Sequence, residues 1–201
     1  MNTLIITGPS CSGKTILSNK LCNYFSNTIV IKTDSYYRDD LWIKLLSLFK
    51  YDIYDRFISI KDKELVKAIN CIQNKEKIIN FYNYDFRRKI SSKDTRTFNY
   101  EKEFRFLILE GIFSHRLDIN YNKTINIVCN EKKDVCYERR LKRDILYRGR
   151  SVKEVNRKFS RSWNLYYENF FKYTKNNSII TLNPADNILY TDLINKLNKI
   201  S

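Results

Sequence analysis

An eight-residue stretch near the N-terminus carries the residue types that hold a nucleotide phosphate. It reads Gly8-Pro9-Ser10-Cys11-Ser12-Gly13-Lys14-Thr15, follows an apolar run over 4–7 and precedes a segment with helical spacing. A GxxxxGK(S/T) loop in this context binds phosphate because glycines allow close approach and backbone N–H groups face the anion. Lys14 is expected to reach the β- and γ-phosphates and Thr15 to hold Mg²⁺. A chance glycine turn is the alternative, but the complete motif favours binding of a nucleoside triphosphate.

Two carboxylates each follow an apolar strand. Asp34 comes after residues 28–31, and Glu110 comes after residues 104–109. Ligands of open α/β sheets bind at the carboxyl ends of the strands, so Asp34 is a candidate base or metal ligand and Glu110 a candidate metal ligand. On position alone, a helix N-cap explains Asp34 equally well.

Arginines gather between residues 139 and 150. Arg140, Arg143, Arg148 and Arg150 are spaced so that a helical section presents several of them toward one side. Residues 131–161 hold 12 basic and 5 acidic side chains, which is nearly half of the excess positive charge. A solvated basic helix would explain such a run elsewhere. Beside a phosphate loop, the arginines are better explained as groups that stabilise transferred phosphate.

Composition limits the class of protein. A chain of 201 residues that is 43% hydrophobic fits one folded α/β domain. The net charge of +15 suggests nucleic-acid binding, but the absence of a clustered basic tail favours a basic surface around a phosphate site, so a nucleic-acid partner is not expected. Five cysteines with one histidine favour reduced thiols over zinc ligation. Without a signal-peptide pattern or a long apolar run, we expect no membrane partner and a cytoplasmic location.

Strands and helices are expected to alternate along the chain. Further strands are expected over 77–86, 95–100, 123–129 and 178–182, with a polar turn over 87–94. Helices are expected over 16–25, 39–50, 61–74 and 131–147, after Ser151 with Glu154 completing a capping box, and after Pro184. The 39–50 segment would place Leu41, Leu45, Leu48 and Phe49 on one side. This order predicts a parallel sheet covered by helices on both faces, with a hairpin outside it.

Five motifs follow the phosphate loop in order. They are Asp34-Ser35-Tyr36-Tyr37-Arg38, residues 51–57 (YDIYDRF), Tyr84-Asp85-Phe86, Glu110-Gly111-Ile112, and the arginine run over 139–150. Together with the loop they resemble the DSFYR, FDHPDAFD, YDF, EGI and RRxxRDxxxRGR motifs of the uridine kinase family of P-loop nucleoside kinases. The resemblance covers nearly the whole chain. It implies one kinase domain over 1–201, with a hairpin insertion at about 77–100 and a lid at about 139–158.

The resemblance also implies roles. Asp34 would accept the proton of a nucleoside 5′-hydroxyl, and Asp52 and Arg140 would hold the ribose hydroxyls. Mg²⁺ would lie on Thr15 and Glu110, with Asp34 near it. The acceptor site would be completed by Tyr37, Tyr84, Phe86, Lys89, Ile112, Arg150 and Lys158. ATP, or GTP as an alternative donor, would lie on Gly8, Ser10, Ser12, Gly13, Lys14 and Thr15 beneath Arg143, Arg148 and Arg150. Family members assemble as homo-oligomers, so a homo-oligomer is expected here.

Two positions depart from the family pattern. Lys89 stands where the family has a base-contacting histidine, and Lys158 stands where it has a base-contacting glutamine. Histidine and glutamine can both donate and accept hydrogen bonds, whereas a lysine only donates them. The sequence therefore does not determine which base the acceptor carries. The single histidine, His115, is interpreted as a loop residue and not as a replacement.

Three functional hypotheses follow. The first is phosphorylation of uridine or cytidine to the 5′-monophosphate by ATP and Mg²⁺. The second keeps the donor site but changes the acceptor to nicotinamide riboside or to a compound that carries a carboxylate or phosphate, because of Lys89 and Lys158. The third is a non-catalytic nucleic-acid-binding protein. The presence of Asp34, Asp52 and Glu110 argues against it, because a binding protein has no need of these acidic residues.

Overall fold

A five-stranded parallel sheet forms the centre of the molecule. The computed structural model describes residues 1–50, 52–101, 103–119, 122–173 and 179–200. The strands are β1 (Asn2–Thr7), β2 (Thr28–Lys32), β5 (Phe106–Glu110), β6 (Thr124–Cys129) and β7 (Ile179–Leu182), in the order β2-β5-β1-β6-β7. Every pairing is parallel. The predicted fold class is confirmed.

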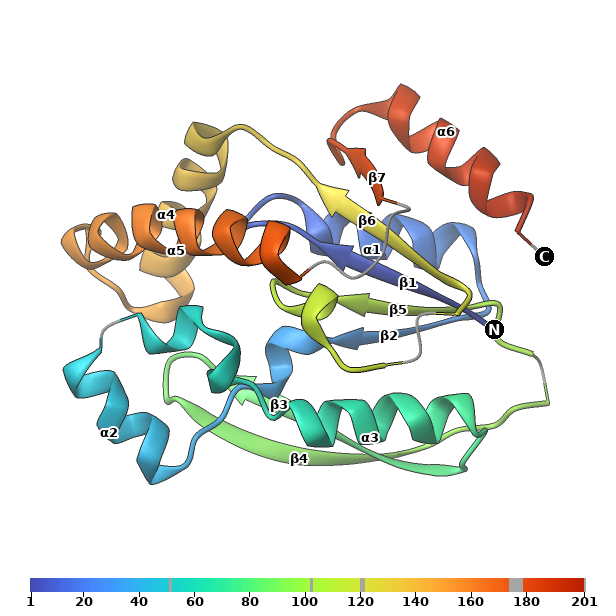
Figure 1. Ribbon diagram of the computed structural model, residues 1–201, viewed down its shortest axis with the longest axis horizontal. Coiled ribbons are helices and arrows are strands. Elements are labelled where there is room, and N and C mark those ends of the chain that lie inside the picture. The colour runs from blue at the N-terminus through green and yellow to red at the C-terminus, as the bar shows by residue number, and fades with distance from the viewer. Residues whose placement is uncertain (51, 102, 120–121, 174–178, 201) are drawn as a thin grey trace.

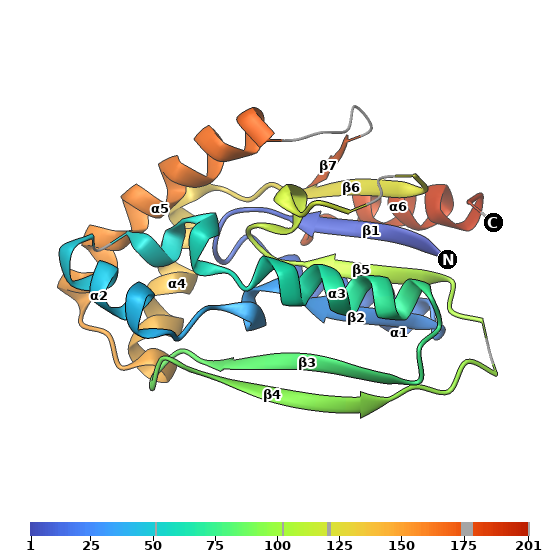
Figure 2. The ribbon, with the colours of Figure 1, turned by 60° about the horizontal axis from the view of Figure 1, so that its bottom comes forward.

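Side chains that alternate along the central strands build two cores. Leu4 and Ile6 of β1 pack in one core with α1 (Lys14–Tyr24) and α6 (Asn187–Asn198), whereas Ile5 packs in the other with α3 (Asp62–Gln73). The long helix α5 (Val152–Tyr173) crosses beside β6, against Val128. Figures 1 and 2 show the sheet between these layers of helices. Both faces of the sheet are therefore covered, as the buried apolar strands require.

A separate hairpin lies outside the main sheet. Strands β3 (Ile78–Asp85) and β4 (Ile90–Thr97) pair antiparallel and run beneath α3 in Figure 2. The prediction of a long turn over 87–94 followed by a strand over 95–100 is wrong. The Asp85 carboxylate accepts hydrogen bonds from the N–H groups of Arg87 and Arg88 at 2.8 and 2.9 Å, which closes a short turn. Because β4 is polar and mostly exposed, its sequence lacks the alternation that marks a strand.

The remaining elements lie at the carboxyl end of the sheet. Helix α2 (Leu41–Phe49) begins where the Asp40 side chain accepts a hydrogen bond from the Ile43 N–H. Helix α4 (Lys133–Arg148) ends at Gly149, whose φ of 64° is the left-handed conformation that glycine adopts easily. Ser151 then caps α5 by accepting a hydrogen bond from the Glu154 N–H, as predicted.

Short 3-10 turns complete the chain. They are η1 (Thr33–Tyr36), η2 (Ile53–Asp55), η3 (Phe57–Ser59) and η4 (Ser114–Arg116). Two predicted segments extend beyond the described residues, because Tyr51 of the 51–57 motif and Ser178 of the last strand lie outside them. The ends of β1, β2 and β5 bring the phosphate loop, η1 and Glu110 to one edge, next to α4 and α5 (Figure 1).

Candidate active site

The phosphate loop joins β1 to α1, and its two glycines lie where a side chain does not fit. A Cβ at Gly8 would lie 2.6 Å from the carbonyl oxygen of Cys129, and one at Gly13 would lie 2.9 Å from Cγ of Pro184. Gly13 also has a φ of 94°, which disfavours other residues. The loop is thus folded tightly against the ends of β6 and β7. The first N–H groups of a helix have no partner within the helix, so those of α1 are suited to bind an anion.

Lys14 and Ser12 contribute buried polar groups to the loop. The Lys14 ammonium donates to the carbonyl oxygens of Gly8 and Pro9 at 3.0 and 2.9 Å. The Ser12 hydroxyl is buried and has no hydrogen-bond partner among the described residues. A buried ammonium and an unsatisfied hydroxyl in a glycine loop fit a phosphate, which would accept hydrogen bonds from both.

Thr15 and Glu110 form a pair of oxygen ligands beside the loop. The Thr15 hydroxyl donates to Oε1 of Glu110 at 3.2 Å. Burial raises the pKa of Glu110 and the nearby Asp34 raises it further, while Lys14 and Thr15 oppose the shift. The described residues contain no cluster of three or more His, Cys, Asp or Glu side chains suited to a metal. A hydroxyl and one or two carboxylates fit Mg²⁺, which keeps several waters and takes other ligands from phosphates.

Asp34 is fixed by the segment that follows Glu110. Its Oδ1 accepts a hydrogen bond from the N–H of Ile112 at 3.1 Å. A Cβ at Gly111 would overlap the Thr33 hydroxyl and lie 2.7 Å from that same carboxylate oxygen. The glycine therefore allows η1 to approach the end of β5, and this approach positions Asp34.

Two cavities meet at Asp34. The first lies over the phosphate loop and is lined by Lys14, Thr15 and Glu110, among others. The second has a volume of about 160 Å³ and lies between η1, the hairpin and the α4–α5 turn. Ser10, Asp34 and Arg143 line both cavities. We call them the phosphate cavity and the acceptor cavity, and a group bound in one can contact a group bound in the other at Asp34.

The acceptor cavity collects most of the residues that the sequence assigned to substrate. Its lining includes Tyr37, Tyr84, Phe86, Lys89, Ile112, Arg140, Arg143, Arg148, Arg150 and Lys158. The Tyr37 ring lies 5.4 Å from the Tyr84 ring and 5.7 Å from the Phe86 ring, centre to centre. These three rings form an aromatic wall suited to a planar base.

Asp52 lies apart from the residues that line this cavity. Its carboxylate is buried and pairs with Arg56 at 2.8 Å and Arg161 at 3.2 Å. Those hydrogen bonds outweigh burial and lower the pKa of Asp52. Asp55, one turn further on, lines the cavity instead. Burial raises the pKa of Asp55, although Arg140, Lys158 and Arg150 oppose the shift.

Sequence reasoning assigned no role to Asp55 and none to Asp144. Asp144 is fully buried in α4 and pairs with four arginines: Arg143 and Arg150 at 2.8 Å, and Arg140 and Arg148 at 3.5 Å. Burial raises its pKa, but the guanidinium charges outweigh burial and leave the pKa lowered. The sequence feature that could have identified Asp144 is its place inside the arginine run, four residues after Arg140 and four residues before Arg148.

The arginines around Asp144 also contact both cavities. Arg143 donates to the Ser10 hydroxyl at 3.3 Å, which joins α4 to the phosphate loop. The Arg148 guanidinium lies 3.9 Å from the centre of the Phe86 ring, close enough for a cation–π interaction. Burial, with the neighbouring Arg143, lowers the pKa of Arg148 to about 10. The cluster joins the phosphate loop, the α4–α5 turn and the aromatic wall.

Both lysines that depart from the family pattern line the acceptor cavity. Lys89 lies in the hairpin turn with a φ of 56°, and its N–H donates to the carbonyl oxygen of Asp85. Lys158 pairs with Glu154 at 3.0 Å. The hypothesis of an anionic or nicotinamide-bearing acceptor requires both lysines to line the cavity, and both do.

His115 is buried in η4, beneath the loop. Its Nδ1 lies 3.2 Å from the Thr7 hydroxyl, and burial, with Arg116, lowers its pKa to about 4. It packs against the rings of Tyr166 and Phe170. The histidine is therefore neutral near pH 7 and belongs to the core beside the site.

All five cysteines are free thiols.

An α/β fold that places carboxylates and clustered arginines beside a phosphate loop is typical of P-loop kinases. Comparison with known families agrees: residues 4–184 match the phosphoribulokinase / uridine kinase family, and the chain belongs to this family. Family membership supports a phosphotransferase that binds a nucleotide. Among the described residues, no helix is long and apolar enough to cross a membrane.

Known relatives are similar but distant. The chain is 27% identical over 198 residues to a uridine kinase of Schizosaccharomyces pombe, covering 94% of this chain but only 42% of that protein. Similar solved structures include a kinase attributed to a fructose transport system of Silicibacter sp. TM1040, with a TM-score of 0.64, 14% identity, and coverage of 90% and 89% of the two chains. A protein described as a possible uridine kinase from Bacillus stearothermophilus has a TM-score of 0.53, 14% identity, and coverage of 89% and 88%. At such identities the solved structures support the fold alone.

Proposed function

We propose that this protein transfers the γ-phosphoryl group of ATP to the 5′-hydroxyl of a nucleoside, with uridine or cytidine as the expected acceptor. The observation that carries the proposal is the position of Asp34, which lines the phosphate cavity and the acceptor cavity together. A carboxylate there can accept the proton of an acceptor hydroxyl as that oxygen attacks a phosphate held by the loop. The curated uridine kinase relative supports this choice of acceptor.

The donor half consists of the phosphate loop, its oxygen ligands and the lid. Lys14 would reach the β- and γ-phosphates once they displace the Gly8 and Pro9 carbonyls from its ammonium. Thr15 and Glu110 would hold Mg²⁺, with Asp34 near it; the ion would neutralise charge on the transferred group. The guanidinium groups of Arg143, Arg148 and Arg150 would add positive charge from the other side. GTP is the alternative donor.

The acceptor half consists of the aromatic wall and the charged residues of the cavity. Tyr37, Tyr84 and Phe86 would hold the base, and Arg140 would donate to the ribose hydroxyls. Resemblance to the family proposes Asp52 as the carboxylate partner of Arg140. The cavity lining favours Asp55 for that role, because Asp52 is already paired with two arginines. In this conformation we therefore assign the ribose contact to Asp55.

An acceptor panel tests the proposal. The purified chain is incubated with ATP and Mg²⁺ and with uridine, cytidine, adenosine, guanosine, nicotinamide riboside or no acceptor, and the products are identified by mass spectrometry. We expect UMP and CMP to form fastest and little ADP to form without acceptor. Equal ADP formation with and without every acceptor would contradict the proposal.

A second candidate is the same chemistry on an anionic or nicotinamide-bearing acceptor. It is favoured by Lys89 and Lys158, which place two further positive charges around the acceptor cavity. Under this candidate, K89M and K158M would each raise the KM of the true acceptor with little change in kcat. If the two variants leave KM for uridine unchanged and no anionic acceptor is phosphorylated, the candidate is excluded.

A further inference from the structure

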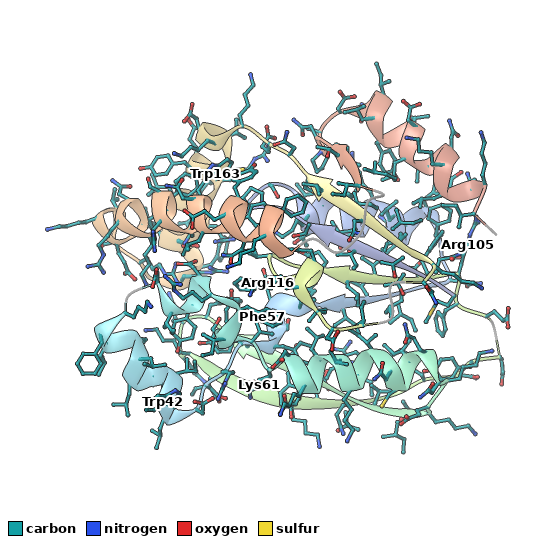
Figure 3. The ribbon with its side chains drawn as sticks, viewed as in Figure 1. Trp42, Phe57, Lys61, Arg105, Arg116 and Trp163 are labelled. Atoms are coloured by element: carbon teal, nitrogen blue, oxygen red, sulfur yellow. The ribbon has the colours of Figure 1, made fainter. Side chains whose placement is uncertain are left out.

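Helix α2 exposes a continuous apolar face, formed by Leu41, Trp42, Leu45, Leu48 and Phe49. These side chains are between 52% and 88% exposed, and Ile43 is the buried residue of the helix. The helix lies at the lower left of Figure 1, at the edge of the molecule, and Figure 3 labels Trp42 on it. A helix with so much apolar surface is normally buried against another element.

The spacing of these residues fits packing against another helix. Positions 41, 45 and 48 follow the i, i+4, i+7 pattern, and 42 and 49 lie one heptad apart beside them. At 100° per residue the five side chains occupy one stripe about 120° wide. Stripes of this kind form the seam between two packed helices, whose ridges and grooves repeat at the same intervals.

The exposed area is large enough for a stable contact. At about 150–250 Å² for a large side chain, five residues exposed to this extent present on the order of 700 Å². The largest apolar patch on a typical monomer is about 300–600 Å². A standard interface buries about 800 Å² on each partner, so the apolar face of α2 supplies most of one side.

We propose that the apolar face of α2 is the contact surface of a homodimer, with α2 of one chain packed against α2 of a second copy about a two-fold axis. A two-fold contact uses the same patch on both chains and needs no other partner. Residues 38–50 carry three basic and two acidic side chains, although the whole chain has a net charge of +15. Within this segment Arg38 pairs with Asp40, and Asp39 pairs with Lys61. The region is therefore nearly neutral, and two copies can meet there without strong repulsion.

A lipid surface fits these residues less well. A helix that lies on a membrane combines its apolar face with a strongly charged polar face. The opposite side of α2 instead carries Ile43, buried against the protein, and Ser47, which lines the acceptor cavity. Because Ser47 lies there, the dimer contact would support one wall of that cavity. The dimer itself does not depend on the proposed kinase activity.

Sedimentation velocity with a matched control tests the dimer. We expect the wild-type chain to sediment as a dimer that dissociates on dilution, and L45E/F49E to sediment as a monomer with an unchanged far-UV circular dichroism spectrum. The control I188E adds a charge at another exposed apolar side chain, on α6, and should remain dimeric. A monomeric wild type, or a dimer that survives L45E/F49E, would overturn the proposal.

Tryptophan fluorescence gives an independent measurement. In the W163F variant Trp42 is the remaining tryptophan, since the chain has two. Its emission should shift to shorter wavelength as protein concentration rises through the dimer transition, and L45E/F49E in the same background should abolish the shift. Co-sedimentation of a monomeric wild type with phosphatidylserine vesicles, lost in L45E/F49E, would assign the surface to lipid instead and refute the dimer.

Discussion

Replacing Asp144 with asparagine should destabilise the lid strongly. The buried carboxylate pairs with four arginines, two of them at 2.8 Å, and asparagine keeps its shape but removes its charge. Removing one partner of a buried ion pair typically costs about 3–5 kcal/mol, because the remaining charge is left buried and uncompensated. Four crowded guanidinium groups would be left here, so we expect the free energy of unfolding to fall by about that amount.

Urea denaturation of wild type and D144N at neutral pH measures this loss. The control is E138Q, an exposed position on the same helix, which should change stability by less than about 0.5 kcal/mol. Because the pKa of Asp144 is lowered in the folded protein, its stabilising contribution is present above the ordinary value of 3.8 and is lost as pH falls through the folded pKa. The difference between wild type and D144N should therefore disappear in strong acid. A D144N variant within 1 kcal/mol of wild type at neutral pH, a difference of about fivefold in the folding equilibrium, would refute the idea that Asp144 holds the arginines together.

Three further predictions concern the site and the core. G111A should lower kcat more than it weakens ATP binding, since the added Cβ would displace Asp34; equal kcat in steady-state assays would contradict this. R105A should lower the thermal unfolding temperature and leave activity unchanged, because Arg105 donates to the carbonyl oxygens of Leu197 and Asn198 at the end of α6 (Figure 3). We expect the free energy of unfolding to fall by about 1–3 kcal/mol. R105K should recover part of this loss. His115 has a folded pKa of about 4 against 6.5, so the protein should lose about 3 kcal/mol of stability as pH falls from 6.5 to 4. H115Q should flatten this pH profile, and a profile identical to wild type would show that another group is responsible.

The sequence predicted the central fold because its signals were local. Continuous apolar runs identified the buried parallel strands, and the glycine loop fixed the junction between β1 and α1. The position of Asp34 and Glu110 at strand ends was predictable for the same reason, since parallel strands bring their carboxyl ends to one edge. That edge is where the structure places both side chains.

Two features of the site and the hairpin depend on contacts that a sequence pattern does not show. Asp52 and Asp55 share one short segment, and the choice between them depends on Arg161 of α5, which pairs with Asp52. Strand β4 was misplaced because a tight turn closed by Asp85 lies inside a polar run. The exposed side of α2 has the same periodicity as a buried one, so the pattern alone does not say what covers it.

Transfer of phosphate to a defined hydroxyl tests the central claim most directly. The chain is given γ-labelled ATP and Mg²⁺ with uridine or 5′-deoxyuridine, using wild type and D34N, while ATP affinity is measured separately. We predict label transfer to uridine but not to 5′-deoxyuridine, a fall in turnover of about 10²–10⁴-fold in D34N, and unchanged ATP affinity. Labelled 5′-deoxyuridine, or near-normal turnover in D34N, would contradict a site in which Asp34 activates the 5′-hydroxyl.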